Sequence, residues 1–245
     1  MPAAAIAPEI LAKYEPVMGL AGRRWRRMNL GSWIVFLILS TATICPGQAL
    51  NASANKTLWA PPKVGVDGPI PRPTVTKEMI ASLRLAGFPI TLESTGFEEV
   101  QKRLGGSIGR QGEAGDLERW LCFRGKDTRG RWALWLTGGE VDGPAVTGFQ
   151  WRLLRADENL DKRCISLPNI GGGVQLTIPI HPGMAISELK AALGEPSVER
   201  DNYVSYVHEH QEKINGIPYA SDNGLEALTD KNRVIAINVW KLTTN

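Results

Sequence analysis

The chain has 245 residues, of which 43% are hydrophobic and 22% are charged, a composition typical of a globular protein with one or two domains. It carries 28 Lys and Arg against 25 Asp and Glu, but five of the basic residues and only two of the acidic ones precede residue 50. The rest of the chain is therefore balanced in charge. This balance argues against a nucleic-acid-binding protein, which would need a basic face.

The first 54 residues have the three parts of a signal peptide. The arginines within 23–27 form a positive region, and residues 30–44 form a short apolar run. Small-x-small cleavage sites end at Ala49 and at Ala54. The apolar run is about 15 residues long, shorter than the roughly 20 that a membrane-spanning helix needs. We therefore expect a cleaved leader, whose true start is Met18 or a nearby codon, and a periplasmic or secreted protein that meets the membrane only if the leader stays uncleaved.

Cleavage of the leader leaves two cysteines, Cys122 and Cys164. In an oxidising compartment an isolated pair is expected to form a disulfide. The alternative is a catalytic thiol, which would need a histidine nearby. The chain has three histidines, all of them in its other half: His181, His208 and His210.

The first half of the mature chain is predicted to contain a tether, helices and strands. Residues 55–75 are rich in proline, which favours an extended tether. A helix is predicted over Thr76–Ala86, followed by an extra strand at Pro89–Glu93. A second helix is indicated by apolar residues three and seven positions after Phe97. Three segments rich in aromatic and β-branched residues then predict an antiparallel meander: 117–123, 131–137 and 145–154.

The second half repeats this order. A strand at 174–180 and a helix at 184–193 precede three predicted strands, at 202–210, 224–229 and 233–242. When the halves are aligned, Val100 corresponds to Leu189, and 149–151 falls near 237–240. The predicted fold class is therefore α+β, with two tandem units, 76–168 and 169–245. Each unit would be a short helical segment packed on a three- to four-stranded antiparallel meander.

The second unit resembles the SmpA/OmlA family of small envelope lipoproteins. The residues that carry the resemblance are Gly183, Met184, Glu188, Leu189, Leu193, Gly194, Pro196, Tyr203, Tyr206, Asn232, Arg233 and Val234. Two such units in tandem, exported and with a disulfide, are similar to the architecture of β-lactamase inhibitory protein. The resemblance covers roughly residues 88–245 and implies protein binding through exposed sheet faces, without a cofactor.

The chain departs from these families in three ways. The lipobox of the SmpA/OmlA proteins is absent, because Ile44 precedes Cys45 where a small residue is required. Both remaining cysteines lie in the first unit or at its exit, whereas the inhibitors have a disulfide in each unit. In the first unit, residues 105–107 replace the Leu-Gly-x-Pro pattern.

Aromatic residues on the predicted strands are the candidate binding residues. Trp132 and Trp135 are an odd number of positions apart, so they point to opposite faces of the sheet. One face must pack on the helices, whereas the other either packs internally or presents tryptophan to a partner. The predicted binding set is Trp120, Trp132, Trp135, Trp151, Tyr203 and Tyr206.

Two other patterns carry weaker hypotheses. His208 and His210 share one strand face, where a zinc ion could bind, but solvated histidines are the default and no metal or other cofactor is expected. The glycine-rich stretch 105–115 follows a helix and lacks the ending of a phosphate-binding loop, so it is interpreted as a connection.

The sequence thus predicts an exported bacterial envelope protein that binds another protein and is not an enzyme. One version is an inhibitor or immunity-type protein, and the alternative is an accessory factor of outer-membrane or cell-wall assembly. A second alternative is a periplasmic ligand-binding protein or enzyme, which a deep pocket with convergent polar groups would favour.

Overall fold

The computed structural model describes residues 56–64, 72–75, 79–113, 116–139, 143–167 and 173–244. All of them belong to one compact unit, which spans Ala49–Asn245. The predicted signal peptide lies outside the described residues. Within the described ranges, no helix has the length and apolar character needed to cross a membrane.

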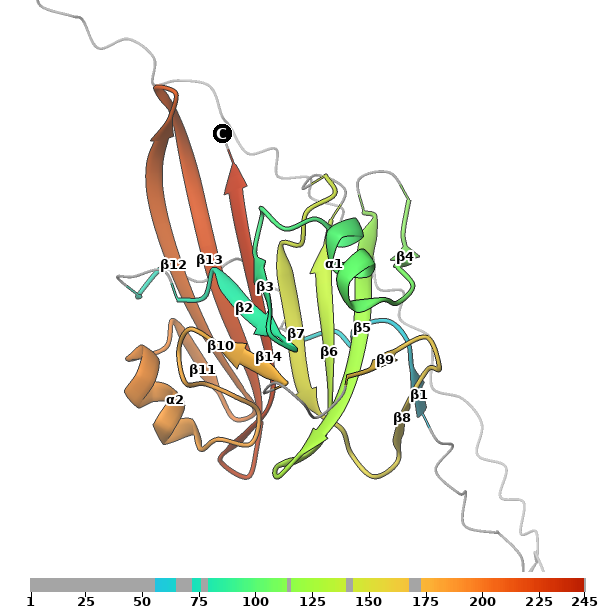
Figure 1. The fold of residues 1–245 in the computed structure, drawn as a ribbon. Coiled ribbons are helices and arrows are strands. Elements are labelled where there is room, and N and C mark those ends of the chain that lie inside the picture. The colour runs from blue at the N-terminus through green and yellow to red at the C-terminus, as the bar shows by residue number, and fades with distance from the viewer. Residues whose placement is uncertain are drawn as a thin grey trace, which may run out of the picture. The chain divides into compact units, whose positions relative to one another are not determined.

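Strands dominate the described structure (Figure 1). The central sheet has nine strands, eight of which follow one another in the spatial order β11 (Val198–Arg200), β12 (Tyr203–Ile214), β13 (Ile217–Asp230), β14 (Arg233–Thr244), β7 (Gly148–Leu153), β6 (Gly130–Gly138), β5 (Glu118–Asp127) and β4 (Gly109–Gln111). The ninth, β9 (Ile165–Ser166), pairs in parallel with β5. A three-stranded sheet contains β10 (Val174–Leu176), β2 (Ser82–Leu85) and β3 (Phe88–Thr91), and β1 (Lys56–Leu58) pairs in parallel with β8 (Glu158–Leu160). The helices are α1 (Phe97–Leu104) and α2 (Ile186–Leu193).

The predicted α+β fold class is wrong. Each helix has only eight residues, and the strands do not form separate units. Instead, β14 pairs antiparallel with β7, from Ala236 opposite Arg152 to Trp240 opposite Gly148. This pairing joins the strands that follow α1 to the strands that follow α2, so that one continuous sheet crosses both halves of the chain.

The predicted helix over Thr76–Ala86 is also wrong in its described part. Ser82–Leu85 is a strand whose leucines alternate with exposed or partly exposed neighbours. Ala86 and Gly87 have φ values of 50° and 82°, so they form a tight turn back into β3. The extra strand predicted at Pro89–Glu93 is confirmed as β3, and the other predicted strands and helices are found near their expected positions.

One face of the central sheet, here called the helix face, carries the larger core. Figure 1 shows the small sheet β10-β2-β3 and the helices lying over this face. Apolar side chains from both layers meet there, including Leu85 and Ile90 from the small sheet and Phe123, Trp151 and Ile237 from the large one. Phe97 and Val100 attach α1 to the same core.

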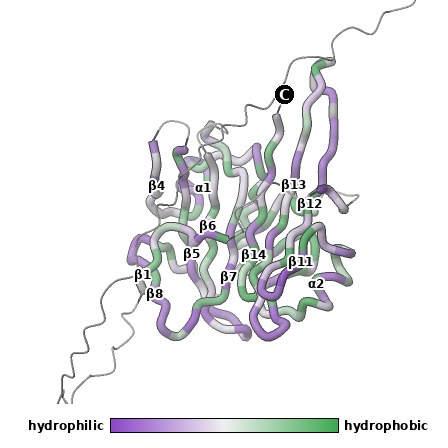
Figure 2. The backbone as a smooth tube through the Cα atoms, turned by 180° about the vertical axis from the view of Figure 1, so that it is seen from behind, coloured by the Kyte–Doolittle hydropathy of each residue, from purple (hydrophilic) through white to green (hydrophobic). Residues whose placement is uncertain are grey.

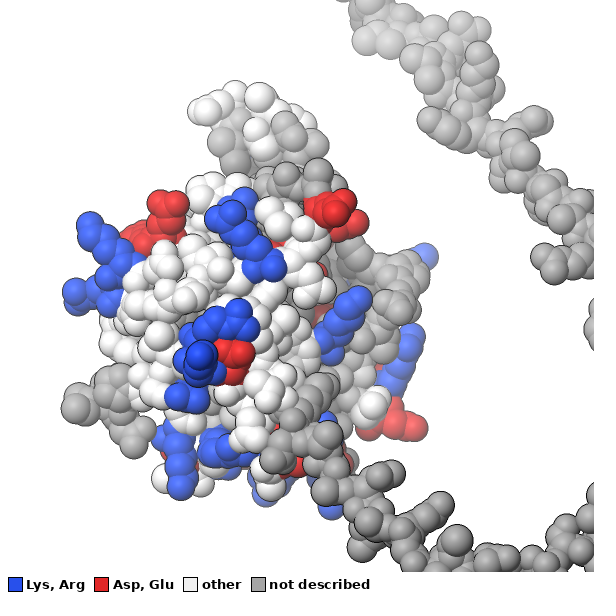
Figure 3. Space-filling view, turned by 90° about the vertical axis from the view of Figure 1, so that its right-hand side faces the viewer, with Lys and Arg blue, Asp and Glu red and all other residues white. Residues whose placement is uncertain are grey.

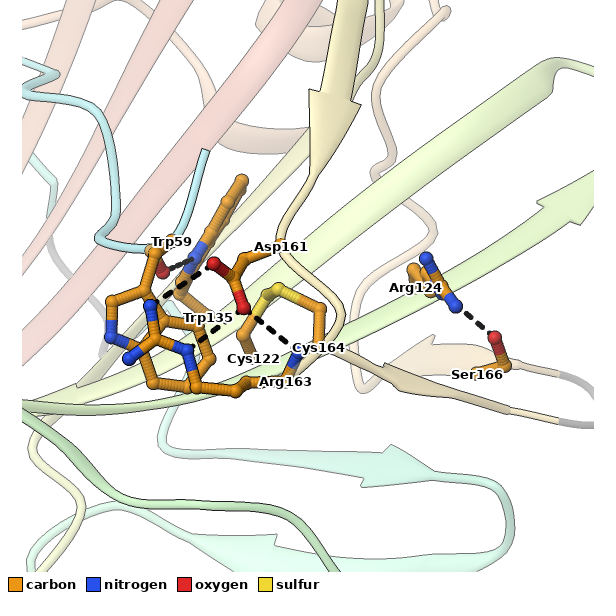
Figure 4. The surroundings of a disulfide bond; sticks show 8 residues. All are labelled: Trp59, Cys122, Arg124, Trp135, Asp161, Arg163, Cys164 and Ser166. Atoms are coloured by element: carbon orange, nitrogen blue, oxygen red, sulfur yellow. Dashed lines mark hydrogen bonds and ion pairs between the residues drawn. A yellow bond between two sulfur atoms is a disulfide. The ribbon is translucent and has the colours of Figure 1, made fainter. Parts of the chain in front are cut away.

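The opposite face, here called the disulfide face, is covered at its β5–β7 end by the β1–β8 pair. Cys122 on β5 is bonded to Cys164, and the Cα atoms are 4.6 Å apart, which confirms the predicted disulfide (Figure 4). Trp135 lies beside this bond and donates its Nε1–H to the Trp59 carbonyl, 2.9 Å away. The Arg163 guanidinium lies over the Trp59 ring, 4.1 Å from its centroid.

The proline-rich stretch predicted as a tether is part of the folded unit where it is described. Leu58 is 5% exposed in the core of the disulfide face. Further along, the backbone N–H groups of Thr74 and Val75 both donate to the Val207 carbonyl. The proline-rich stretch therefore contacts the disulfide face near Leu58 and strand β12 near Thr74 and Val75.

Tryptophan rings in the central sheet pack over glycines on the neighbouring strand. Trp132 is paired with Gly125, and Trp120 is paired with Gly109. A Cβ atom built on Gly125 would lie 2.2 Å from the Trp132 ring, and one on Gly109 would lie 2.1 Å from the Trp120 ring. Only glycine leaves room for such a ring against the backbone, so these positions fix the packing of the tryptophans.

A buried asparagine links the segment before β2 to the central sheet. Asn223 on β13 is 1% exposed, and its Oδ1 accepts hydrogen bonds from the backbone N–H groups of Met79 and Ile80 at 3.0 and 3.1 Å. Its Nδ2 donates to the carbonyls of Ile80 and Trp240. All four hydrogen-bonding positions of the amide are therefore used in the interior.

We predict that Gly125→Ala lowers the free energy of unfolding by about 2 kcal/mol, because overpacking a core costs roughly 1–3 kcal/mol. Trp132→Leu removes the clashing ring, so the two losses in a double-mutant cycle should be less than additive. Gly96→Ala is the control, since the nearest atom to its new Cβ is 3.7 Å away. Additive losses in urea denaturation would contradict the proposed contact.

We further predict that Asn223→Ala costs about 3 kcal/mol of stability, because it leaves several buried backbone groups without partners. Asn159→Ala, at an exposed position of β8, should change stability by less than about 0.5 kcal/mol. Thermal and chemical unfolding of both variants measures the difference. Equal stabilities would show that the four hydrogen bonds do not hold the segment before β2.

Candidate binding pocket

A pocket of about 500 Å³ lies on the disulfide face, beside the segment 61–64. Its floor is built from neighbouring strands of the central sheet, β6, β7, β14 and β13, which run side by side in the view of Figure 2. The pocket lies across the β7–β14 pairing, so both halves of the chain contribute to it. The lining residues that carry polar side chains are Lys63, Glu118, Arg119, Thr137, Thr147, Gln150, Glu226 and Asn238.

Gln150 provides a buried hydrogen-bond acceptor in this pocket. It is 2% exposed, and its Nε2 donates to the Pro62 carbonyl at 2.8 Å. Because a carbonyl oxygen can only accept, this bond fixes the orientation of the Gln150 amide. The other amide atom, Oε1, is buried and has no hydrogen-bond partner among the described residues. An unsatisfied buried polar atom costs roughly 1–3 kcal/mol, a cost that a bound donor would remove.

A carboxylate next to Gln150 is held by both of its oxygens. The Tyr203 hydroxyl donates to Glu226 Oε1 at 2.7 Å, and Asn238 Nδ2 donates to Oε2 at 2.9 Å. The three residues come from the adjacent strands β12, β13 and β14. Burial, followed by the hydrogen bond to Glu226, raises the pKa of Tyr203 to about 12. The network gives the pocket a fixed polar wall.

Arg119 on β5 adds a donor to the opposite side of the lining. Its Nη1 donates to the Gly143 carbonyl at 3.2 Å, which orients the guanidinium. Its Nε is buried and has no hydrogen-bond partner in the described ranges. Arg119 precedes Trp120 on β5, so its side chain leaves the sheet on the helix face, whereas Gln150 lies on the disulfide face beside Pro61 and Pro62.

The predicted set of aromatic binding residues is not at the surface. All six side chains are at most 4% exposed, namely Trp120, Trp132, Trp135, Trp151, Tyr203 and Tyr206. Trp132 and Trp135 do point to opposite faces, as predicted, but both faces are covered in this part of the sheet. The alternative of internal packing is therefore correct. Tyr203 contacts the pocket lining through Glu226, and Trp135 and Trp120 are the cross-strand neighbours of the lining residues Gln150 and Thr137.

The strands that carry Gln150 and Asn238 correspond to each other in the sequence alignment of the two halves. The structure places these two residues directly opposite each other in the β7–β14 pairing. Neither belongs to a recognisable motif, and sequence reasoning missed both. Their only signal is a polar residue within a strongly apolar strand, in the stretches FQWRL and INVWKL.

The histidine pair of the zinc hypothesis lies on β12, with its two rings stacked 6.3 Å apart. His208 Nδ1 is 3.0 Å from the Val75 carbonyl, which a protonated Nδ1 would contact as a donor. No group of three or more His, Cys, Asp or Glu side chains converges in the described ranges. The histidines therefore add no site to the pocket.

The raised pKa of Tyr203 predicts a loss of stability at alkaline pH. The folded state holds this proton more tightly than the unfolded state, whose pKa is about 10, so the stabilisation is complete below pH 10 and is lost as the pH rises through about 12. Burial likewise raises the pKa of Tyr206 to about 12.

Urea denaturation at increasing pH should therefore show a smaller alkaline loss for both Tyr203→Phe and Tyr206→Phe than for the wild type. At neutral pH the two variants should differ. Tyr203→Phe loses the hydrogen bond to Glu226 and about 1–2 kcal/mol. Tyr206→Phe removes a buried hydroxyl that has no partner among the described residues and should cost little. If both variants lose stability at alkaline pH as steeply as the wild type, the raised pKa values of Tyr203 and Tyr206 are contradicted.

Comparisons with known proteins identify no relative of this chain. No protein-family model matches it, and no curated protein and no solved structure gives a match. The resemblance to the SmpA/OmlA family therefore stays a prediction, and the pocket itself is the basis for a function.

Proposed function

We propose that this protein is a non-catalytic binding protein whose pocket on the disulfide face holds a peptide segment of a partner protein. The observation that carries the proposal is Gln150, which lines the pocket and whose buried Oε1 has no hydrogen-bond partner among the described residues. A group that donates an N–H there would satisfy it.

A peptide group carries the required donor in its N–H. The apolar surfaces of Pro61, Pro62 and Val64 border the same space and can pack against side chains of the bound segment. The volume of about 500 Å³ lies within the roughly 300–1,000 Å³ that is usual for ligand sites. Hydrogen bonds would fix the backbone of the segment, and the proline wall would select its side chains.

The proposal combines protein binding, the predicted class of function, with a polar pocket, the feature expected of the second alternative, a ligand-binding protein. The tryptophans are interior residues, so the contact would be made through polar groups in a pocket and not through an aromatic surface. The signal-peptide pattern supports a partner in the bacterial envelope or outside the cell. A loop or terminus of an exported protein is then the expected ligand.

The test is a selection of random peptides, displayed on phage, against the full-length protein. We expect enriched peptides to bind the wild type and to bind Gln150→Leu about tenfold more weakly, since the substitution removes the acceptor while keeping a similar size. Isothermal titration with synthetic copies of the enriched peptides measures the difference.

Gln101→Leu is the matched control. Gln101 also donates through Nε2 to a backbone carbonyl at 2.8 Å, but it lies on α1, outside the pocket. Its variant loses an equivalent hydrogen bond and should keep wild-type affinity. Failure to enrich any peptide, or equal binding by the wild type and Gln150→Leu, would overturn the proposal.

A further inference from the structure

A second pocket, of about 400 Å³, lies near the β5–β6 turn and the β8–β9 segment. It is here called the basic pocket, because three cationic side chains line it and its described lining contains no acidic residue. The cationic residues are Arg124, Lys126 and Arg131, and the apolar ones are Trp132, Leu154, Leu160 and Leu167. Figure 3 faces this side of the molecule, where Lys and Arg are spread over the surface and Asp and Glu are fewer.

The strand pairing brings like charges together in the basic pocket. Lys126 on β5 is directly opposite Arg131 on β6. Arg124 is two residues before Lys126 and therefore points to the same face. Like charges directly opposite each other destabilise a sheet. A bound anion would remove this repulsion.

Three carboxylates on the segments that adjoin the basic pocket are paired with other cations. Glu158 is 1% exposed and accepts from the Arg152 guanidinium at 2.9 and 3.0 Å and from the Arg155 backbone at 3.0 Å. Asp161 forms an ion pair with Arg163, and Asp127 forms one with Arg129. These pairs leave the positive charge of the pocket without an acidic partner in its lining.

Two of the three cations are held in place by neutral groups. Arg124 Nε donates to the Ser166 hydroxyl at 2.7 Å (Figure 4). Arg131 Nη2 donates to the carbonyls of Arg155 and Glu158 at 2.8 and 3.0 Å. Neutral partners orient the guanidinium groups but do not cancel their charge. A fixed guanidinium is well suited to bind phosphate oxygens.

We propose that the basic pocket binds a phosphate ester, with the phosphate between Arg124, Lys126 and Arg131. The apolar part of the ester would pack on Leu154 and Leu160, which lie on the same face as the three cations. The arrangement thus selects ligands that combine an anionic head with an apolar body. This inference does not rest on the peptide pocket, because the two pockets share no lining residue.

Isothermal titration of the full-length protein with phenyl phosphate tests the proposal. We expect saturable binding, weaker binding of inorganic phosphate, which lacks the apolar body, and weaker binding of phenol, which lacks the charge. Lys126→Gln and Arg124→Gln should each lower the affinity for phenyl phosphate about tenfold. Arg124→Lys keeps the charge and should restore part of the loss.

Lys102→Gln removes an exposed cation on α1, outside the basic pocket, and should leave the affinity unchanged. Thermal unfolding of each variant checks that the fold is kept. Absence of phenyl phosphate binding by the wild type, or equal binding by the wild type and the Arg124→Gln, Lys126→Gln double variant, would overturn the proposal.

A phosphate ester could come from a lipid headgroup or from a soluble compound. A competition experiment distinguishes these two sources. Vesicles of phosphatidylglycerol are added to the complex of the wild type with phenyl phosphate, and sedimentation with the vesicles is compared for the wild type and the double variant, which carries the same leader. Displacement of phenyl phosphate, together with sedimentation that depends on Arg124 and Lys126, would identify a lipid headgroup as the source. Retention of phenyl phosphate would identify a soluble phosphate ester.

Discussion

The antiparallel pairing of β7 with β14 is the contact on which the rest of the structure depends. It joins the two halves of the chain into one sheet, and it places Gln150 directly opposite Asn238. The peptide pocket lies across this junction, with Gln150 on one side and the Tyr203–Glu226–Asn238 network on the other. Neither half alone contains both the unpaired acceptor and the fixed carboxylate.

Burial on both faces is the second constraint. At the β5–β7 end of the sheet, α1 and the small sheet cover one face, whereas β1, β8 and the disulfide cover the other. Gly125 leaves room for the Trp132 ring, which packs against it. The tryptophans of β5, β6 and β7 are buried, and polar residues of neighbouring strands line the pocket.

The sequence predicted the local elements of the fold better than their arrangement. Alternation and turn residues located the long strands, and apolar spacing located both helices. The small sheet was missed in part because Met79, Ile80 and Leu83 have the spacing of a helix face, while the Ala86–Gly87 turn was interpreted as a helix end. Strand alternation does not specify which edges will pair, so the sequence could not show that β7 meets β14 and not solvent.

The sequence predicted less of the candidate sites than of the secondary structure. The pairing of Cys122 with Cys164 followed from their number and the expected compartment. The burial of Trp120 and Trp135 involves residues 56–64, whose proline content predicted a tether and not a cover for the sheet. The peptide pocket is lined by single polar residues from different strands. The basic pocket is lined by Arg124 and Lys126, two positions apart on β5, and by Arg131 on β6.

The order of the strands also determines when each part of the fold can form during synthesis. Strand β1 pairs with β8, about one hundred residues later in the chain, so Lys56–Leu58 cannot find its partner until Glu158–Leu160 has been made. Strand β7 must then wait for β14, and until β14 is complete it presents an unpaired edge that carries Phe149 and Trp151. Exposed apolar edges of this kind favour association with other chains. The nascent chain would therefore be most prone to aggregate after its first half has left the ribosome or the export channel and before its last strand arrives.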